Sequence, residues 1–250
     1  MSTLHRPALS DLLAYLGEMG YGDLYLKPSR PAARAASAPP AVQPAPAALP
    51  APPPRDEASA QRATQLAALA GVAAGCTRCR LSEGRNKVVF GAGNPAAELM
   101  FVGEGPGAEE DRQGLPFVGA AGELLAKIIQ AIDRTREQVY IANVVKCRPP
   151  GNRDPQPDEV STCRGFLDQQ IALVRPRVLV ALGRVAAQTL LGNDAPIGRM
   201  RGQWFQVQGI PTMVTYHPAA LLRNPALKRP TWEDMQQVRD FLLAEPAGSL

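Results

Sequence analysis

The segment Leu99-Met-Phe-Val-Gly-Glu-Gly-Pro-Gly107 joins an apolar run to a turn that contains three glycines and a proline. The run Leu99–Val102 predicts a buried strand. The turn lets the backbone approach a ligand closely, because glycine has no Cβ. It carries one carboxylate, Glu104, and an aromatic residue, Phe117, follows it. Open α/β sheets bind ligands where strands end, so the turn predicts a pocket for a flat ligand.

Strand and helix patterns alternate on either side of this turn. The expected strands are Val88–Gly91, Leu99–Gly103, Gln138–Val145, Val178–Leu182 and Ile210–Thr215, with Trp204–Gln208 as an antiparallel or edge segment. The expected helices are Ala60–Ala74, Gly119–Ile132, Pro157–Val174, Arg184–Leu191 and Thr231–Ala244, the last with Thr231 as its N-cap. Such alternation predicts an α/β fold whose mostly parallel sheet is covered by helices on both faces.

The first 60 residues have a different composition from the rest of the 250-residue chain. Residues 27–60 are so rich in proline and alanine that we expect a disordered linker. Residues 1–26 carry apolar side chains at helical spacing, which predicts a short amphipathic segment that could bind a replication or repair protein. Residues 61–246 form the expected folded domain.

The N-terminal segment does not have the pattern of a signal peptide, because Asp11, Glu18 and Asp23 interrupt it. No apolar run reaches the length of a membrane span. We therefore expect a cytoplasmic protein, and a monomer. The net charge of +4 and a pI near 9.0 favour a polyanionic partner only mildly.

The chain has four cysteines, Cys76, Cys79, Cys147 and Cys163, of which the first two form a C-x2-C motif. A disulfide framework is not expected without an export signal. Four cysteines with none to spare instead predict a metal site with four thiolate ligands. Spacing leaves zinc and an iron–sulfur cluster both open, but the last two cysteines do not form a zinc knuckle, which favours the cluster. Such a site would attach the N-terminal helix to the loop Lys146–Pro157.

Two polar residues next to expected strands are candidates for ligand binding. Asn143 lies in an apolar strand, where its amide is either satisfied within the sheet or reads a donor and an acceptor on a ligand. His217, the only histidine outside the N-terminal tail, follows the strand Ile210–Thr215 and precedes Pro218. A lone histidine can be structural, but its place at a strand end favours function.

Apolar and basic residues after His217 could contact nucleic acid. Leu221, Leu222 and Arg223 lie in a segment bounded by prolines, which we expect to be a loop; exposed leucines beside a cation are typical of a wedge inserted into a base stack. Ordinary packing would also explain the leucines. Nearby cations that could meet phosphates are Arg199, Arg201, Lys228 and Arg229.

Taken in order along the chain, these motifs resemble those of the family 4 uracil-DNA glycosylases, the iron–sulfur branch of the uracil-DNA glycosylase superfamily. The resemblance covers about residues 70–245. It rests on Cys76-x-x-Cys79 with Arg80, Glu83-Gly-Arg85, Gly103-Glu-Gly-Pro-Gly107, Glu110-Asp111, Pro116-Phe-Val-Gly119, Asn143-Val-Val-Lys-Cys-Arg-Pro-Pro150, Cys163, His217-Pro218 and Leu221-Leu-Arg-Asn-Pro225.

The resemblance implies a fold, a cofactor and an activity. The fold would be a three-layer α/β/α sandwich with a mostly parallel four-stranded sheet, and the four cysteines would hold a 4Fe–4S cluster. The activity would be hydrolysis of the N-glycosidic bond of deoxyuridine in DNA, which releases uracil and leaves an abasic site. Another branch of the superfamily becomes covalently trapped on DNA through a histidine in an inserted loop, but no histidine lies between Asn143 and His217 here, so we expect normal turnover.

The resemblance also implies a role for each candidate residue. Phe117 would stack on the extruded uracil, Asn143 would bind its polar edge, and the turn at Gly105 and Pro106 would contact a carbonyl. His217 would stabilise the negative charge on uracil O2. Glu104 would act on the water or stabilise the cationic sugar. Leu222 and Arg223 would fill the gap in the duplex.

Two other classes of protein fit parts of this pattern. One is a non-catalytic iron–sulfur module that binds DNA beside replication or repair proteins; the intact turn, Phe117, Asn143 and His217 argue against it. The other is a zinc-containing enzyme that binds a nucleotide phosphate in the glycine-rich turn. The turn lacks the G-x-G-x-x-G pattern, and Glu104 would repel a phosphate.

Overall fold

A sheet of six strands forms the centre of the molecule in a computed structural model that describes residues 55–244, with side chains from residue 60 onward. The strands are β1 (Ala92–Gly93), β2 (Leu99–Gly103), β3 (Tyr140–Asn143), β4 (Val178–Leu182), β5 (Trp204–Val207) and β6 (Ile210–Thr215), in the order β1-β3-β2-β4-β6-β5. The four inner strands are parallel, as predicted, and the two edge strands are antiparallel. The expected four-stranded parallel sheet is thus present, and the two edge strands extend it to six strands. The expected N-terminal amphipathic segment and most of the expected linker lie outside the described residues. Residues 55–60, which were expected to belong to the linker, instead form the first turns of the helix α2 (Arg55–Ala74).

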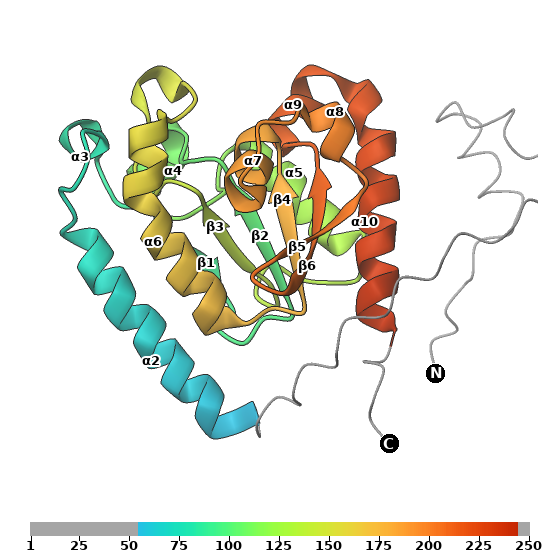
Figure 1. Ribbon diagram of the computed structural model, residues 1–250, viewed down its shortest axis with the longest axis horizontal. Coiled ribbons are helices and arrows are strands. Elements are labelled where there is room, and N and C mark those ends of the chain that lie inside the picture. Colours follow the sequence, from blue (N-terminus) through green and yellow to red (C-terminus); the bar gives the residue numbers. More distant parts are fainter. Residues whose placement is uncertain (1–54, 245–250) are drawn as a thin grey trace, which may run out of the picture. The chain divides into compact units, whose positions relative to one another are not determined.

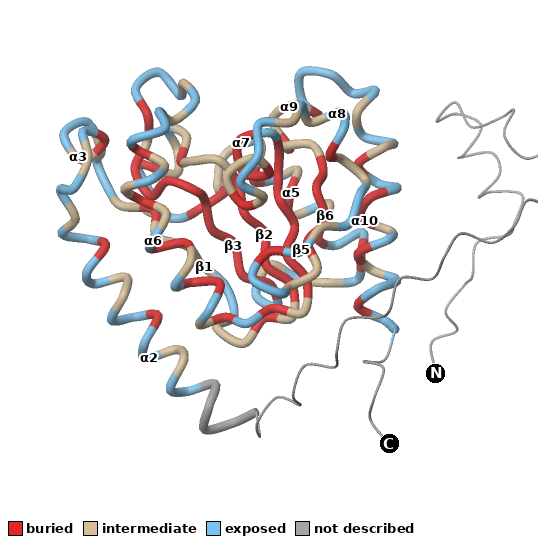
Figure 2. Tube along the Cα trace, viewed as in Figure 1, coloured by how far each residue is buried: buried red, intermediate tan, exposed pale blue. Residues whose placement is uncertain are grey.

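Helices cover both faces of the sheet, which confirms the predicted α/β architecture (Figure 1). One face packs against α6 (Pro157–Val174) and α7 (Arg184–Leu191), and α2 (Arg55–Ala74) packs on α6. The other face packs against α5 (Ala120–Gln130) and α10 (Lys228–Leu243). In β2, Met100 and Val102 belong to the first apolar cluster, and Leu99 and Phe101 to the second. Every residue of β2 and β4 is buried (Figure 2), which explains their unbroken apolar sequences.

Short helices at the ends of strands were not expected from the sequence. They are α3 (Leu81–Gly84), α4 (Ala108–Gln113), α8 (Ile197–Met200), α9 (Pro218–Arg223) and the 3-10 turns η1 (Pro150–Asn152) and η2 (Pro225–Leu227). The segment after His217 is thus a helix and not the expected loop. His217 is its N-cap, and Pro218 occupies the first turn, where a missing N–H costs nothing.

Two predicted elements differ from the structure for local reasons. Val88–Gly91 is not a strand; the edge strand is the two-residue β1, flanked and ended by Gly91 (φ +149°) and Gly93 (φ +128°). A Cβ at Gly93 would lie 2.0 Å from the carbonyl oxygen of Val139, so the close approach to the residue that precedes β3 requires glycine. Thr231 does not cap α10, which begins at Lys228; its hydroxyl donates to the carbonyl of Leu227 at 2.9 Å inside the helix.

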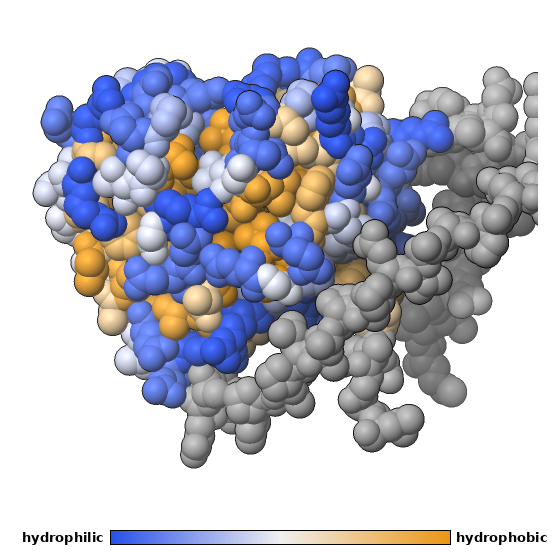
Figure 3. Space-filling view, in the orientation of Figure 1, coloured by the Kyte–Doolittle hydropathy of each residue, from blue (hydrophilic) through white to orange (hydrophobic). Residues whose placement is uncertain are grey.

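Hydrophilic side chains cover much of the face shown in Figure 3, and apolar ones gather toward its middle, in the region of α7. Between residues 55 and 244, no helix is both long enough and apolar enough to cross a membrane.

Candidate active site

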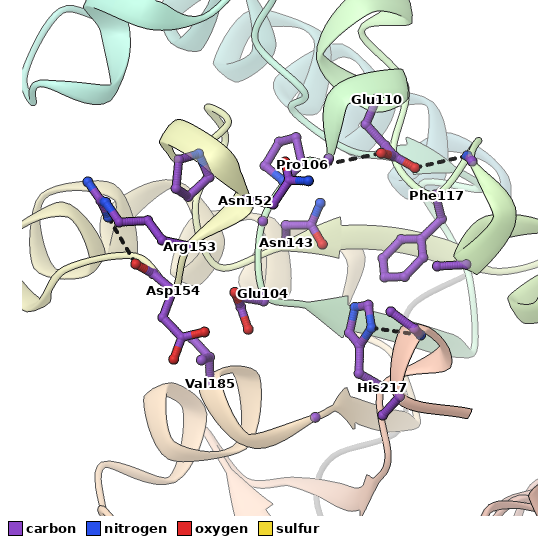
Figure 4. Close-up of a pocket in the computed structure, with 18 of the residues that line it drawn as sticks. Glu104, Pro106, Glu110, Phe117, Asn143, Asn152, Arg153, Asp154, Val185 and His217 are labelled. Atoms are coloured by element: carbon purple, nitrogen blue, oxygen red, sulfur yellow. Dashed lines mark hydrogen bonds between the residues drawn. The ribbon is translucent and has the colours of Figure 1, made fainter. Parts of the chain in front are cut away.

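The carboxyl ends of the four parallel strands open into one cavity of about 640 Å³. Glu104 follows β2, Asn143 ends β3, Gly183 follows β4 and His217 lies just beyond β6. The chain passes from β2 to β3 on one side and then to β4 on the other, so the cavity lies at the topological switch point of the sheet. Its size is that of a small-molecule site. The structure thus brings together candidates that are far apart in the sequence (Figure 4).

The ring of Phe117 forms one wall of the cavity beside His217. The two ring centroids are 5.5 Å apart, and the rings are tilted by 31°. A Cβ at Gly103 would lie 2.6 Å from Cζ of Phe117 and 2.4 Å from Oδ1 of Asn143. Only glycine therefore allows both side chains to meet the end of β2. The first glycine of the turn is needed for this contact and not only for the turn itself.

Asn143 presents an unused hydrogen-bond acceptor. The residue is 1% exposed, and its Oδ1 is buried without a partner. Its main-chain carbonyl is held separately by Nζ of Lys146, at 2.6 Å. Leaving a buried acceptor unpaired costs about 1–3 kcal/mol. An amide kept in this state at a cavity wall indicates a ligand that supplies the missing donor.

His217 is a neutral donor with a defined tautomer. Its Nδ1 accepts a hydrogen bond from the backbone N–H of Ala219 at 3.1 Å. The proton of the neutral ring is therefore on Nε2. Burial, together with the positive charge of Arg223, lowers the pKa of His217 to about 4. The ring stays uncharged at neutral pH and can donate one hydrogen bond from Nε2.

Glu104 lies in the cavity opposite a second carboxylate. Burial, and then the negative charge of Asp154, raise the pKa of Glu104 to about 7, and Arg184 partly opposes the shift. Asp154 itself forms an ion pair with Arg184. The backbone carbonyl of Glu104 accepts from the N–H of Val145 at 3.1 Å, which fixes the turn against the segment after β3. The carboxyl group is therefore close to half-ionised near neutrality.

The cavity wall includes residues that sequence reasoning did not single out. They are Asn152, Arg153, Asp154, Arg184 and Tyr216, and they accompany the expected Gly105 and Pro106. Glu110, which the sequence marked only as part of a family motif without a role, also lines the cavity. Asn152, Arg153 and Asp154 lie on the loop Lys146–Pro157, which the sequence analysis considered only in relation to the cysteines. The polar composition of a proline-rich loop directly after the strand of Asn143 is the signal that could have identified them.

All four cysteines line a second, small cavity. Cys76 and Cys79 follow α2, Cys147 follows β3 and Cys163 lies on α6, and all four are free thiols. Two guanidinium groups donate to sulfur atoms: Arg85 to Sγ of Cys147 at 3.3 Å and Arg78 to Sγ of Cys76 at 3.4 Å. In the part of the chain that the structure describes, no three cysteine, histidine or acidic side chains are grouped as ligands of one metal ion.

The expected DNA-contacting residues differ in exposure. Leu222 is 49% exposed and Arg223 is also exposed, both on α9, whereas Leu221 is buried. Lys228 is exposed at the start of α10.

Arg201 does not fit the expected role of a phosphate contact. Its guanidinium forms an ion pair with the buried Asp234 and donates to the carbonyl oxygen of Pro230 at 3.0 Å. Asp234 in turn accepts from the hydroxyl of Thr215 at 2.7 Å. Arg201 therefore connects the end of α8 to α10, and Asp234 connects α10 to β6.

Comparison with known proteins identifies the class to which this fold and site belong. The family model of the Uracil DNA glycosylase superfamily matches residues 90–236. Among characterised relatives, a type-4 uracil-DNA glycosylase from Sulfurisphaera tokodaii is 44% identical over 177 residues, 67% of this chain and 80% of the relative. The type-4 enzyme of Archaeoglobus fulgidus is 43% identical over 174 residues, 66% of this chain and 87% of the relative. That of Thermotoga maritima is 44% identical over 176 residues, 68% and 91% of the two chains.

The chain belongs to the type-4 uracil-DNA glycosylases. Its activity is that of a uracil-DNA glycosylase, a hydrolase of DNA repair.

Proposed function

We propose that the cavity at the strand ends receives a uracil base extruded from DNA, and that water there cleaves its N-glycosidic bond to leave an abasic site. The observation that carries this proposal is the buried, unpaired Oδ1 of Asn143 beside the ring of Phe117. A flat base with an N–H at its edge supplies a hydrogen-bond donor to Oδ1 of Asn143 and a flat face to the ring of Phe117. Extruding the base costs a few kcal/mol, which stacking and hydrogen bonding in the cavity offset.

Asn143 selects uracil over cytosine by the direction of its hydrogen bonds. Its Oδ1 accepts from N3–H of uracil and its Nδ2 donates to O4. Cytosine has an acceptor at N3 and a donor at C4, so both contacts would be reversed. Phe117 stacks on the base face, and the turn at Gly105 and Pro106 closes the cavity around the base.

His217 and Glu104 act on the two charges that form when the bond breaks. The electron pair of the bond leaves with uracil, and the resulting anion is delocalised onto O2, where Nε2–H of His217 donates a hydrogen bond. The sugar becomes an oxocarbenium-like cation, which the ionised carboxylate of Glu104 stabilises. Water adds to C1′, and Glu104 is placed to accept its proton.

Exposed residues of α9 and α10 contact the DNA around the extruded base. Leu222 enters the gap in the base stack, Arg223 supports it, and Lys228 contacts a phosphate. Arg199 and Arg229 are also exposed and add to this basic rim.

The four cysteines hold a 4Fe–4S cluster. Their convergence on one cavity supports this assignment, and so do the guanidinium donors on two sulfurs, because such donors stabilise thiolates. Cys147 and Cys163 do not form a zinc knuckle, which favours a cluster, in which each iron takes one thiolate, over a single zinc ion. When bound, the cluster cross-links α2, α6 and the segment after β3. It takes no part in bond cleavage.

A labelled oligonucleotide with a single uracil tests the proposed reaction. Incubation with the purified protein followed by alkali should cut the strand at that position, and free uracil should be recovered in equal amount. Cutting without alkali would instead indicate a strand-cleaving activity. Strands that stay intact over a range of salt concentrations would reject the proposal.

A further inference from the structure

Phe117 has a backbone conformation that side chains rarely adopt. Its φ is +53°, in the left-handed region, and the residue is buried. Such a conformation persists only where the surroundings impose it, and it tends to occur at functional sites. The proposed stacking surface is therefore held in place by contacts outside the ring.

The carboxylate of Glu110 accepts hydrogen bonds from backbone N–H groups of the loop that carries Phe117 (Figure 4). Its Oε1 accepts from the backbone N–H of Val118 at 2.9 Å and of Gly119 at 3.0 Å, directly after Phe117. Its Oε2 accepts from the N–H of Gly107 at 3.1 Å. One carboxylate thus joins the Phe117 loop to the glycine-rich turn that carries Glu104.

The guanidinium of Arg136 donates hydrogen bonds to backbone carbonyl groups of the same loop. Nη1 donates to the carbonyl oxygen of Phe117 at 3.0 Å, and Nη2 donates to that of Pro116. The rigid fork of a guanidinium fits two successive carbonyls, whereas a lysine ammonium offers no such geometry. Each side of the left-handed residue is therefore fixed by a different charged side chain.

The loop that carries Phe117 packs closely against its neighbours on two sides. A Cβ at Gly122 would lie 2.0 Å from the carbonyl oxygen of Phe117, and one at Gly103 would lie 2.6 Å from the end of the Phe117 ring. The loop is confined between the first turn of α5 and the end of β2. The hydrogen bonds of Glu110 and Arg136 hold the loop at one position between these two elements. A change in either residue would therefore move the Phe117 ring relative to Asn143.

We propose that Glu110 and Arg136 are positioning residues that hold the Phe117 ring at one distance from the base edge, and so determine the fit of the cavity to uracil. The proposal rests on the proposed function, because it requires that Phe117 stacks on the base. Neither residue touches the base; both act through the loop. A displaced ring would weaken uracil binding and relax the exclusion of the 5-methyl group of thymine.

Inhibition by free bases tests this proposal without contributions from DNA binding or bond cleavage. The inhibition constants of uracil and thymine are measured for Arg136→Lys and Glu110→Gln, each alone and combined with Phe117→Ala. Arg134→Lys and Glu123→Gln are the matched controls, since Arg134 contacts only the carbonyl of Asp133 and Glu123 is exposed on α5. Thermal unfolding of each variant checks the fold.

We expect each positioning variant to weaken inhibition by uracil about tenfold, as for the loss of a hydrogen-bonded anchor, and to reduce the preference for uracil over thymine. Added to Phe117→Ala, the same changes should have no further effect, because coupled residues are not additive. If Glu110→Gln does not fold, Arg136→Lys alone decides the test.

Two results would overturn the proposal, and they are distinguishable. If Phe117→Ala weakens inhibition by uracil but the positioning variants behave like their controls, the anchors have only a structural role. If Phe117→Ala leaves inhibition by uracil unchanged, Phe117 is not the stacking residue, and the proposed function fails at that residue as well.

Discussion

In the proposed reaction, His217 stabilises the developing negative charge as a neutral hydrogen-bond donor. Its Nδ1 is occupied by the N–H of Ala219, and burial keeps the pKa of the ring at about 4. Removing a preorganised donor of this kind costs about 10²–10³-fold in rate. We expect His217→Ala to slow single-turnover release of uracil by that amount while its thermal unfolding stays near that of the wild type. Nitrogen NMR should show the Nε2–H tautomer down to pH 5; a ring that is already protonated at pH 6 would contradict this account.

Glu104 should control the acid limb of the pH–rate profile. In the proposed reaction the ionised form of Glu104 is the active one, and the pKa of Glu104 is about 7, so activity should fall as the pH drops through that value. Asp154→Asn removes the neighbouring negative charge, which should lower the pKa of Glu104 and move the acid limb to lower pH. Asp194→Asn, on an exposed loop, is the control. An acid limb in the same place in Asp154→Asn and in the wild type would show that the two carboxyl groups are not coupled.

At the scale of residues, the sequence predicts the centre of the site but not its supports. Glu104, Asn143 and His217 can be identified because each follows or ends an apolar run that reads as a parallel strand. Glu110 and Arg136 cannot, because their roles depend on hydrogen bonds to a loop that only the folded chain brings near them. The ion pair of Arg201 with Asp234 is hidden from the sequence for the same reason.

The helix α9 presents one exposed leucine and buries the other. Leu222 is exposed beside the cavity, so it is the side chain placed to fill the gap left by an extruded base. We expect Leu222→Ala to slow uracil release from duplex DNA about tenfold, since a few kcal/mol of unstacking must be offset there, and to change release from single strands little. Leu243→Ala, 66% exposed at the end of α10, is the matched control. Equal losses on both substrates would assign Leu222 a packing role.

At the scale of elements, predictions succeeded where sequence patterns were continuous. The strands Leu99–Gly103, Val178–Leu182 and Ile210–Thr215 have the predicted bounds. The first two are continuous apolar runs, as is typical of buried parallel strands. The edge strand was predicted four residues too early, at Val88–Gly91. The observed strand β1 has only two residues beside glycines with positive φ, and so short a segment shows no alternation of apolar and polar side chains. The helix α9 was missed because six residues are too few to show a helical pattern of apolar side chains.

At the scale of the molecule, the cysteine site should connect distant parts of the chain. Cys163→Ala is expected to abolish the visible absorption of an iron–sulfur cluster and to lower the melting temperature, because α2 and α6 lose a cross-link. Ser161→Ala, on the exposed side of α6, should change neither. A colourless wild-type protein with one zinc ion per chain would overturn the cluster assignment.

The proposed selection of uracil depends most on the amide of Asn143, which would bind the edge of the base in the cavity at the strand ends. The most direct test compares single-turnover release of uracil and of cytosine from matched oligonucleotides by the wild type and by Asn143→Asp. The wild type should release uracil alone. The variant, whose carboxylate cannot donate to O4 of uracil, should lose at least about 100-fold in uracil release and in the ratio of uracil to cytosine release. An unchanged ratio in a folded Asn143→Asp protein would show that Asn143 does not read the base.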